Sequence, residues 1–301
     1  MVLDGVTPII LVVVLGFFSA KLQMFNLNSA KELNRMVFFF ALPMFCINLI
    51  TNANFEKFNF ILLACYVFSQ AVTGTIGSLV AHRFWKLPLK TSVLIGLATT
   101  LSNHVLFVLP IAQNLFAGYI IDQISAIIIV DTILIALIVI SVLEGLTSQS
   151  MSLFGILARL SKNPPVLAVF AGLLMVALAI ELPVYLTKLV TFSAYAAAPT
   201  ALFSMGIVIY NTPILAQLKF AVAISSIKVI LQPLVFMIIA GGLLHQSAEM
   251  LKPGLMVAVG PSGTMVLVFA SAYNIDPKPL APVVVLSFLI SIPLLCLTLL
   301  L

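Results

Sequence analysis

Apolar stretches recur along the whole chain, each of roughly the 20 residues that an α-helix needs to cross a bilayer. The composition agrees, because 62% of the 301 residues are hydrophobic and only 8% are charged. An ordinary soluble domain carries about 25% charged residues. The sequence therefore predicts an all-α integral membrane protein embedded in the lipid bilayer. The net charge of +5 reflects basic loops and does not indicate nucleic acid as a partner.

Ten crossings are predicted, near residues 5–21, 31–51, 58–84, 91–116, 121–143, 164–181, 185–210, 218–244, 252–273 and 280–300. If the N-terminus faces outward, ten basic residues fall on the cytoplasmic side and three outside. The first group is Lys21, Lys31, Arg35, Arg83, Lys86, Lys90, Arg159, Lys162, Lys219 and Lys278, and the second is Lys57, Lys188 and Lys252. The positive-inside rule then predicts a multi-pass protein of the cytoplasmic membrane with both termini outside.

The crossings divide into two sets of five, residues 1–145 and 164–301, joined by a predicted cytoplasmic loop over 146–163. Because five is odd, the second set would be inserted upside down relative to the first. Lys57-Phe58 and Gln70 recur as Lys219-Phe220 and Gln232 at a constant offset of 162. Inverted repeats are a common plan of secondary transporters. We therefore expect ten transmembrane helices in two inverted five-helix repeats.

Two crossings carry helix-breaking residues at membrane depth. The ninth contains Val259-Gly-Pro-Ser-Gly-Thr-Met265, in which Pro261 lacks a backbone N–H and Gly260 and Gly263 flank it closely. The fourth contains Asn103 and, further on, Pro110. At a rise of about 1.5 Å per residue, Asn103 and Pro261 both fall near the middle of the bilayer. The sequence predicts broken fourth and ninth helices that cross there, with breaks at Pro110 and Pro261.

Irregular backbone at membrane depth is tolerated where protein buries it or where it lines a cavity. Free N–H groups and the positive ends of half-helices suit an anion, and a carboxylate in particular. The alternative is a kinked helix that packs and binds nothing. The candidate substrate-binding residues are Ser102, Asn103, His104, Gly260, Pro261, Ser262, Gly263, Thr264 and Lys228.

Three of the residues at this depth are ionisable, and such residues inside a membrane are costly. Lys228 could neutralise a carboxylate substrate, pair with Asp131 or extend toward the cytoplasm. Asp131 could carry a coupled proton, since burial favours the neutral carboxyl, or form a structural pair with Lys228. His104 adjoins the candidate site and could titrate or serve packing alone. The coupling ion that these residues indicate is H⁺.

Signals of an enzyme are nearly absent. Ser225-Ser-Ile-Lys228 matches S-x-x-K, but the companion motifs S-D-N and K-T-G are missing. The sequence contains neither a phosphate-binding loop nor an H-E-x-x-H helix, and its cysteines have no C-x-x-C spacing. We expect neither catalytic residues nor a metal or organic cofactor.

Segments along the whole chain resemble the auxin efflux carrier family, which includes malonate carriers and is related in fold to bile-acid sodium symporters. The segments are Leu33–Pro43, Asn103 with Leu109-Pro110 and Phe116–Gly118, Lys162–Pro164, Ala198-Pro199 with Leu202-Phe203 and Gly206, Lys228 with Pro233, Phe269-Ala270 with Tyr273, and Leu286-Ser287 with Ser291.

The resemblance implies a scaffold over about 1–51 and 164–210 and a transport domain over about 58–143 and 218–301, usually in a homodimer. It implies organic anions as substrates. The kinship with the bile-acid sodium symporters makes Na⁺ the alternative coupling ion, although the sequence shows no specific sodium-site pattern. By position, Asn103 matches the asparagine that contacts the substrate carboxylate, and Pro261 matches the crossover proline of the ninth helix. Ser102 and Ser262 depart from the proline and glutamine of the plant carriers, which favours a small mono- or dicarboxylate such as malonate over auxin.

These observations predict a secondary active transporter that moves a small organic anion by alternating access. The alternative is an anion channel or a transporter-like sensor that binds a carboxylate. A carrier shows saturable flux and counterflow, whereas a channel shows unsaturated conductance and a sensor shows no flux.

Overall fold

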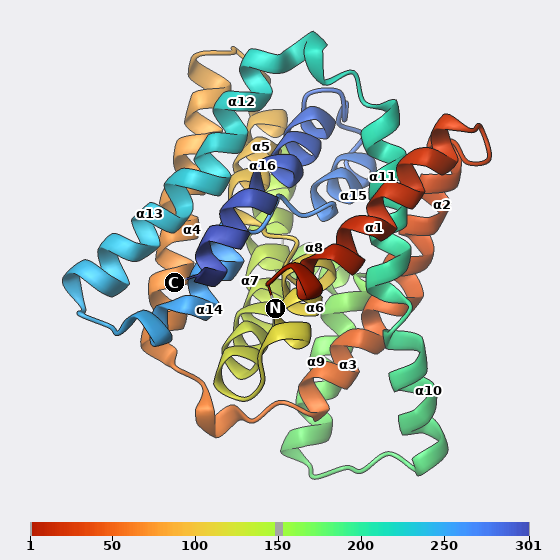
Figure 1. The fold of residues 1–301 in the computed structure, drawn as a ribbon, viewed down its shortest axis with the longest axis vertical. Helices are drawn as coiled ribbons and strands as arrows, with labels where there is room; N and C mark the ends of the chain where they lie inside the picture. The colour runs from red at the N-terminus through yellow and green to blue at the C-terminus, as the bar shows by residue number, and fades with distance from the viewer. Residues whose placement is uncertain (1, 148–152, 301) are drawn as a thin grey trace.

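The computed structural model describes residues 2–147 and 153–300, and most of them are helical (Figure 1). Over these residues no strand forms, apart from one isolated bridge. The first half contains α1 (Val2–Lys21), α2 (Leu27–Met36), η1 (Val37–Ala41), α3 (Leu42–Thr51), η2 (Phe55–Lys57), α4 (Phe60–Arg83), α5 (Leu89–Thr100), η3 (His104–Val108), α6 (Leu109–Leu115) and α7 (Tyr119–Thr147). The second contains α8 (Leu153–Leu160), α9 (Pro164–Ala177), α10 (Val184–Ala194), α11 (Ala197–Asn211), η4 (Ile214–Gln217), α12 (Leu218–Ser226), η5 (Ile227–Leu231), α13 (Gln232–Phe236), η6 (Met237–Leu243), α14 (Ala248–Val259), α15 (Met265–Ala272) and α16 (Leu280–Leu300).

Seven helical stretches in the described residues are long and apolar enough to cross a membrane. They are Asp4–Lys21, Leu27–Thr51, Phe60–Arg83, Tyr119–Leu146, Val184–Asn211, Ile214–Leu243 and Leu280–Leu300. The other three predicted crossings contain shorter helices. Those near 91–116 and 252–273 are each divided in two, and α9 is a helix of 14 residues. The all-helical class and the multi-pass character are therefore confirmed.

Three of the prolines inside helices lie two residues after a π-helical turn. η1, η3 and η5 precede Pro43, Pro110 and Pro233 in this way. The wider turn makes room for the proline ring, which in a regular α-helix clashes with the carbonyl four residues earlier. The prediction that Pro110 breaks the fourth crossing is therefore wrong. The helix runs on from His104 to Leu115, and the break lies earlier, at residues 101–103.

α1 and α11 pack along one another (Figure 1), and their backbones come close at two glycines. A Cβ atom on Gly16 would lie 2.0 Å from the carbonyl oxygen of Phe203, and one on Gly206 would lie 2.0 Å from that of Val13. Helices in membranes commonly associate through such small residues, since lipid supplies no hydrophobic driving force between them. These glycines therefore join the first and seventh predicted crossings.

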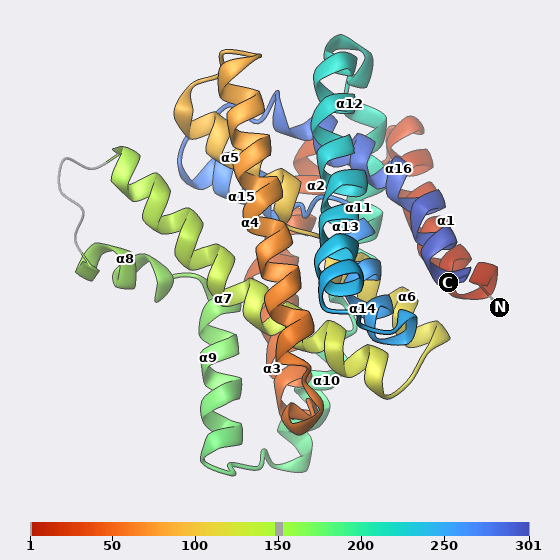
Figure 2. The ribbon, with the colours of Figure 1, turned by 90° about the vertical axis from the view of Figure 1, so that its left-hand side faces the viewer.

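The predicted loop over 146–163 contains a short helix, α8, which projects beside α7 and α9 (Figure 2). Its Arg159 forms an ion pair with Glu144 at the end of α7, and its guanidinium lies 5.2 Å from the ring centre of Tyr273. Residues 148–152 of the predicted loop lie outside the described residues. The segment thus attaches to the end of α7 through an ion pair and to the end of α15 through a cation–aromatic contact.

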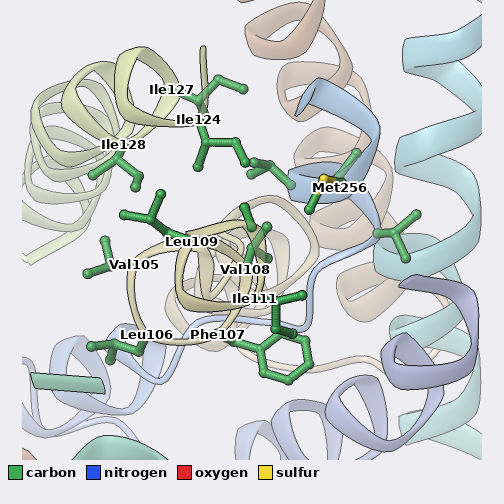
Figure 3. Close-up of a cluster of buried hydrophobic side chains, with 14 of the residues drawn as sticks. Val105, Leu106, Phe107, Val108, Leu109, Ile111, Ile124, Ile127, Ile128 and Met256 are labelled. Atoms are coloured by element: carbon green, nitrogen blue, oxygen red, sulfur yellow. The ribbon is translucent and has the colours of Figure 1, made fainter. Parts of the chain in front are cut away.

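The stretch 105–112 of the fourth crossing, in η3 and α6, is apolar on all sides. Figure 3 shows its Val105, Leu109 and neighbouring side chains packed against Ile124 and Ile128 of α7, with Met256 of α14 nearby. A helix that is hydrophobic all round is a buried one. The interrupted backbone at its start is therefore enclosed by protein, as membrane depth requires.

Candidate functional site

The two interrupted crossings meet at their breaks. α5 ends at Thr100 and η3 begins at His104, while α14 ends at Val259 and α15 begins at Met265. Between them, Ser102 and Ser262 form an antiparallel bridge. The N–H of Asn103 donates to the carbonyl of Pro261 at 2.7 Å, and the N–H of Gly263 donates to that of Leu101 at 2.8 Å. Each break thus satisfies backbone groups of the other.

Two serine hydroxyls hold this crossover together. Ser102 Oγ donates to the carbonyl of Val257 at 2.6 Å, and Ser262 Oγ donates to that of Ala98 at 2.6 Å. Ser262 also donates its N–H to Ser287 Oγ at 3.0 Å. Both serines are buried, at 2% and 0% exposure. Ser262, predicted as a substrate ligand, is fully engaged in joining the half-helices, and Ser102 lines the cavity described below with its hydroxyl already bound.

Lys228 lies fully buried at the carbonyl end of α14. Its Nζ donates to Ser102 Oγ at 2.8 Å, to the carbonyl oxygen of Ala258 at 2.8 Å and to Gln232 Oε1 at 2.6 Å. Three acceptors require three N–H donors, so the geometry is that of an ammonium ion. Lys228 therefore neither extends toward the cytoplasm nor lines the cavity, and no ion pair joins it to Asp131 within the described residues.

A cavity of about 70 Å³ lies on the other side of the crossover, where the half-helices η3 and α15 begin. This space can hold water, since roughly 10–15 Å³ on this measure suffices for one molecule. Its polar wall comes from the crossover and α7, and residues from α3 and the start of α9 close it. The lining residues are Leu42, Leu101, Ser102, Asn103, His104, Val105, Leu106, Asp131, Thr132, Ile135, Ala136, Asn163, Pro165, Val166, Gly263, Thr264, Met265 and Phe269.

Both half-helices begin at the cavity without a cap. Neither Asn103 nor Thr264, their N-cap residues, makes a capping hydrogen bond. In the described part of the chain, the N–H groups of His104, Val105 and Met265 donate to no backbone carbonyl. The side-chain amide of Asn103 likewise has no hydrogen-bond partner there. Free N–H groups at a helix N-terminus attract an anion.

One acidic residue lies in the same wall. Asp131 Oδ2 is 3.0 Å from His104 Nε2 and accepts a hydrogen bond of 3.0 Å from Gln70 Nε2. Gln70 also donates to the hydroxyl of Tyr66 at 3.3 Å. No group of three His, Cys, Asp or Glu side chains that could hold a metal occurs in the residues described.

The structure divides the predicted site residues into two groups. Ser102, Asn103, His104, Gly263, Thr264 and Asp131 line the cavity, whereas Gly260, Pro261, Ser262 and Lys228 belong to the crossover behind it. Tyr66 was not predicted as a site residue, and Gln70 was predicted only as a marker of the repeat. The 162-residue offset could have pointed to both, because it relates Tyr66 to Lys228 as it relates Gln70 to Gln232.

A larger hollow of about 880 Å³ lies where α5, α12 and α16 begin, with Trp85, Lys219 and Asp276 in its wall. It contains none of the predicted site residues. It shares no lining residue with the smaller cavity.

Comparison with known proteins assigns the chain to a family. Residues 1–153 and 147–299 match the family described as membrane transport protein, so that the matches cover nearly the whole chain. The chain belongs to the auxin efflux carrier family. Its predicted membership is thereby confirmed, and membrane transport is the activity that the family name describes.

Relatives in this family are similar at modest identity. Auxin efflux carrier component 5 of Arabidopsis thaliana is 22% identical over 98% of this chain and 94% of its own length. The uncharacterized transporter YfdV of Escherichia coli (strain K12) is 25% identical over 95% of this chain and 94% of its own length. A putative malonate transporter of Rhizobium meliloti (strain 1021) is 28% identical, but only over 46% of this chain and 43% of its own length.

Proposed function

We propose that this member of the auxin efflux carrier family is a secondary carrier that moves a small organic anion across the cytoplasmic membrane by alternating access. The observation that carries the proposal is the pair of uncapped helix N-termini that meet at one cavity deep in the protein. Gradient-driven carriers commonly bind their substrates at such discontinuous helices.

The groups around the cavity match a carboxylate. Its oxygens accept hydrogen bonds, and the free N–H groups of His104 and Met265 and the amide of Asn103 can donate them. The N-terminal ends of η3 and α15 add partial positive charge. Lys228 adds a full positive charge behind Ser102. We assign substrate binding to the free N–H groups and the Asn103 amide, and electrostatic support to Lys228.

The cavity volume of about 70 Å³ favours a small acid. One relative over part of the chain is named a putative malonate transporter. We therefore propose a mono- or dicarboxylate, with malonate as the first compound to test.

We also propose that the chain forms ten crossings in two inverted repeats. Supporting this, the two backbone hydrogen bonds of the bridge are equivalent at one offset of 160. That offset relates Leu101 to Pro261 and Asn103 to Gly263, so the bond from Asn103 to Pro261 corresponds to the bond from Gly263 to Leu101. The scaffold would comprise about 1–51 and 164–210, and the transport domain about 58–143 and 218–301. A homodimer is expected from the family resemblance.

The structure agrees with an outward N-terminus. In Figure 1 the α4–α5 connection and the start of α12, which carry Lys86 and Lys219, lie at one end of the molecule. The α9–α10 connection and η2, near Lys188 and Lys57, lie at the opposite end. We propose that the first end is cytoplasmic.

The test is ligand binding and flux with purified protein. Acetate, glycolate, malonate and succinate are screened by thermal shift, and acids that stabilise the protein are then measured in proteoliposomes. Saturable uptake with counterflow is expected. Asn103→Ala should weaken binding at least tenfold, whereas Asn52→Ala, at the exposed end of α3, should not. Unsaturated conductance would instead indicate a channel, and binding without flux a sensor.

A further inference from the structure

Asp131 and His104 form a buried acid–base pair in the cavity wall. Their side chains are 1% and 6% exposed, and their nearest atoms, Oδ2 and Nε2, are 3.0 Å apart. Nevertheless Asp131 Oδ1 and His104 Nδ1 are buried without a hydrogen-bond partner in the residues described. Buried polar atoms are nearly always paired, so two orphans on neighbouring residues point to a missing ligand or proton.

The pair conflicts with an anionic substrate. An ionised Asp131 places a negative charge in the cavity that the carboxylate would enter, and like charges repel strongly where water is scarce. The other titratable side chains close by, in the described residues, are Tyr66, which contacts Gln70 and Ser102, and Lys228, behind Ser102. Lys228 offsets one negative charge, which leaves the second uncompensated.

One proton on the pair removes this conflict. When Asp131 is ionised, His104 Nε2 donates to Oδ2, so a neutral ring keeps Nδ1 as an acceptor. A proton on Nδ1 neutralises the pair and converts that atom into a donor. Both changes favour a carboxylate beside Asn103, the residue that immediately precedes His104.

We propose that Asp131 and His104 are the proton-coupling site of the carrier, and that one proton binds to the pair with each substrate molecule. This inference rests on the proposed function. It assigns H⁺, not Na⁺, as the coupling ion and gives Gln70 the role of positioning the Asp131 carboxylate.

The experiment uses the full chain in detergent, with malonate as the probe. A pH-sensitive dye in weak buffer should report uptake of about one proton for each malonate bound by the wild type. Malonate affinity, measured from pH 5.5 to 9, should fall about tenfold per pH unit on the alkaline side, as linkage to one proton requires. Asp131→Asn and His104→Gln should abolish both effects, whereas His245→Gln, at an exposed position, should keep them.

The outcomes separate the two proposals. If malonate binds to the wild type without proton uptake, or if its affinity requires Na⁺, the coupling site is overturned and the anion site stands. Because it uses the wild type, this measurement tests the coupling site even if a variant fails to fold. If the wild type binds none of the four acids at any pH, the proposed function and the coupling both fall.

Discussion

Tyr66 and Lys228 approach the same hydroxyl from two different helices. Tyr66 Oη lies 3.4 Å from Ser102 Oγ, and Lys228 Nζ lies 2.8 Å from it. Each also contacts a glutamine four residues further along its own helix, Gln70 and Gln232 respectively. The two residues are separated by the 162-residue offset of the repeat. Positions that the proposed repeat would relate thus contact one atom of the crossover, but only one of them is a cation.

Replacement of this cation should loosen the crossover. Lys228→Met removes the donor from Gln232 Oε1 and from the carbonyl of Ala258, both of which stay buried. A buried acceptor left unpaired costs about 1–3 kcal/mol. We expect a clear drop in the thermal unfolding midpoint in detergent and a loss of malonate affinity. Lys188→Met, at an exposed position, is the control, and an equal midpoint for the two variants would contradict the assignment.

The contact between α1 and α11 should tolerate no added methyl group. A Cβ on Gly206 would meet the backbone carbonyl of Val13 at 2.0 Å and the backbone N of Phe17 at 2.5 Å, so the helices must move apart. Overpacking of this kind typically costs about 1–3 kcal/mol. Gly206→Ala should therefore lower the unfolding midpoint, measured by differential scanning fluorimetry. Gly242→Ala is a matched control because nothing lies within 4 Å of its added Cβ. Equal stability of the two variants would refute the close packing.

Gln70 should tune the proton-coupling site. Its Nε2 donates to Asp131 Oδ2 at 3.0 Å and holds the carboxylate against His104. Gln70→Leu removes that donor, so the carboxylate loses a contact that positions it. Proton uptake per malonate, measured by calorimetry in buffers of different ionisation enthalpy, should therefore fall below the wild-type value. Unchanged proton uptake would show that Gln70 does not position Asp131.

The proposed orientation predicts which lysine positions are accessible from outside. Single cysteines at Lys188 and Lys278, both exposed, are introduced after Cys296→Ser. In intact cells, an impermeant maleimide should label the Lys188→Cys variant, and the Lys278→Cys variant only after lysis. The reverse pattern would invert the orientation, and labelling of both from outside would contradict the number of crossings between them.

The sequence alone predicted the all-helical class and the interruption around Pro261. Both depend on local features, namely the length of the apolar stretches and the helix-breaking Gly-Pro-Ser-Gly segment. It placed the other break wrongly, since a π turn lets Pro110 remain in a helix. The role of Lys228 depends on side-chain direction, which depth in the membrane does not reveal. The Asp131–His104 contact joins residues 27 positions apart on different helices, so only the packing of α7 against η3 brings them together.

The ammonium of Lys228 is bonded to the crossover itself, so it must travel with the crossover whenever that unit moves. If the unit returns empty with Asp131 ionised, these two charges cancel, and the membrane voltage exerts little net force on the return step. Loaded with one proton and a monoanion, the unit again carries no net charge. With one proton and a dianion, it carries one negative charge. Voltage sensitivity of transport would thus depend on the valence of the acid carried.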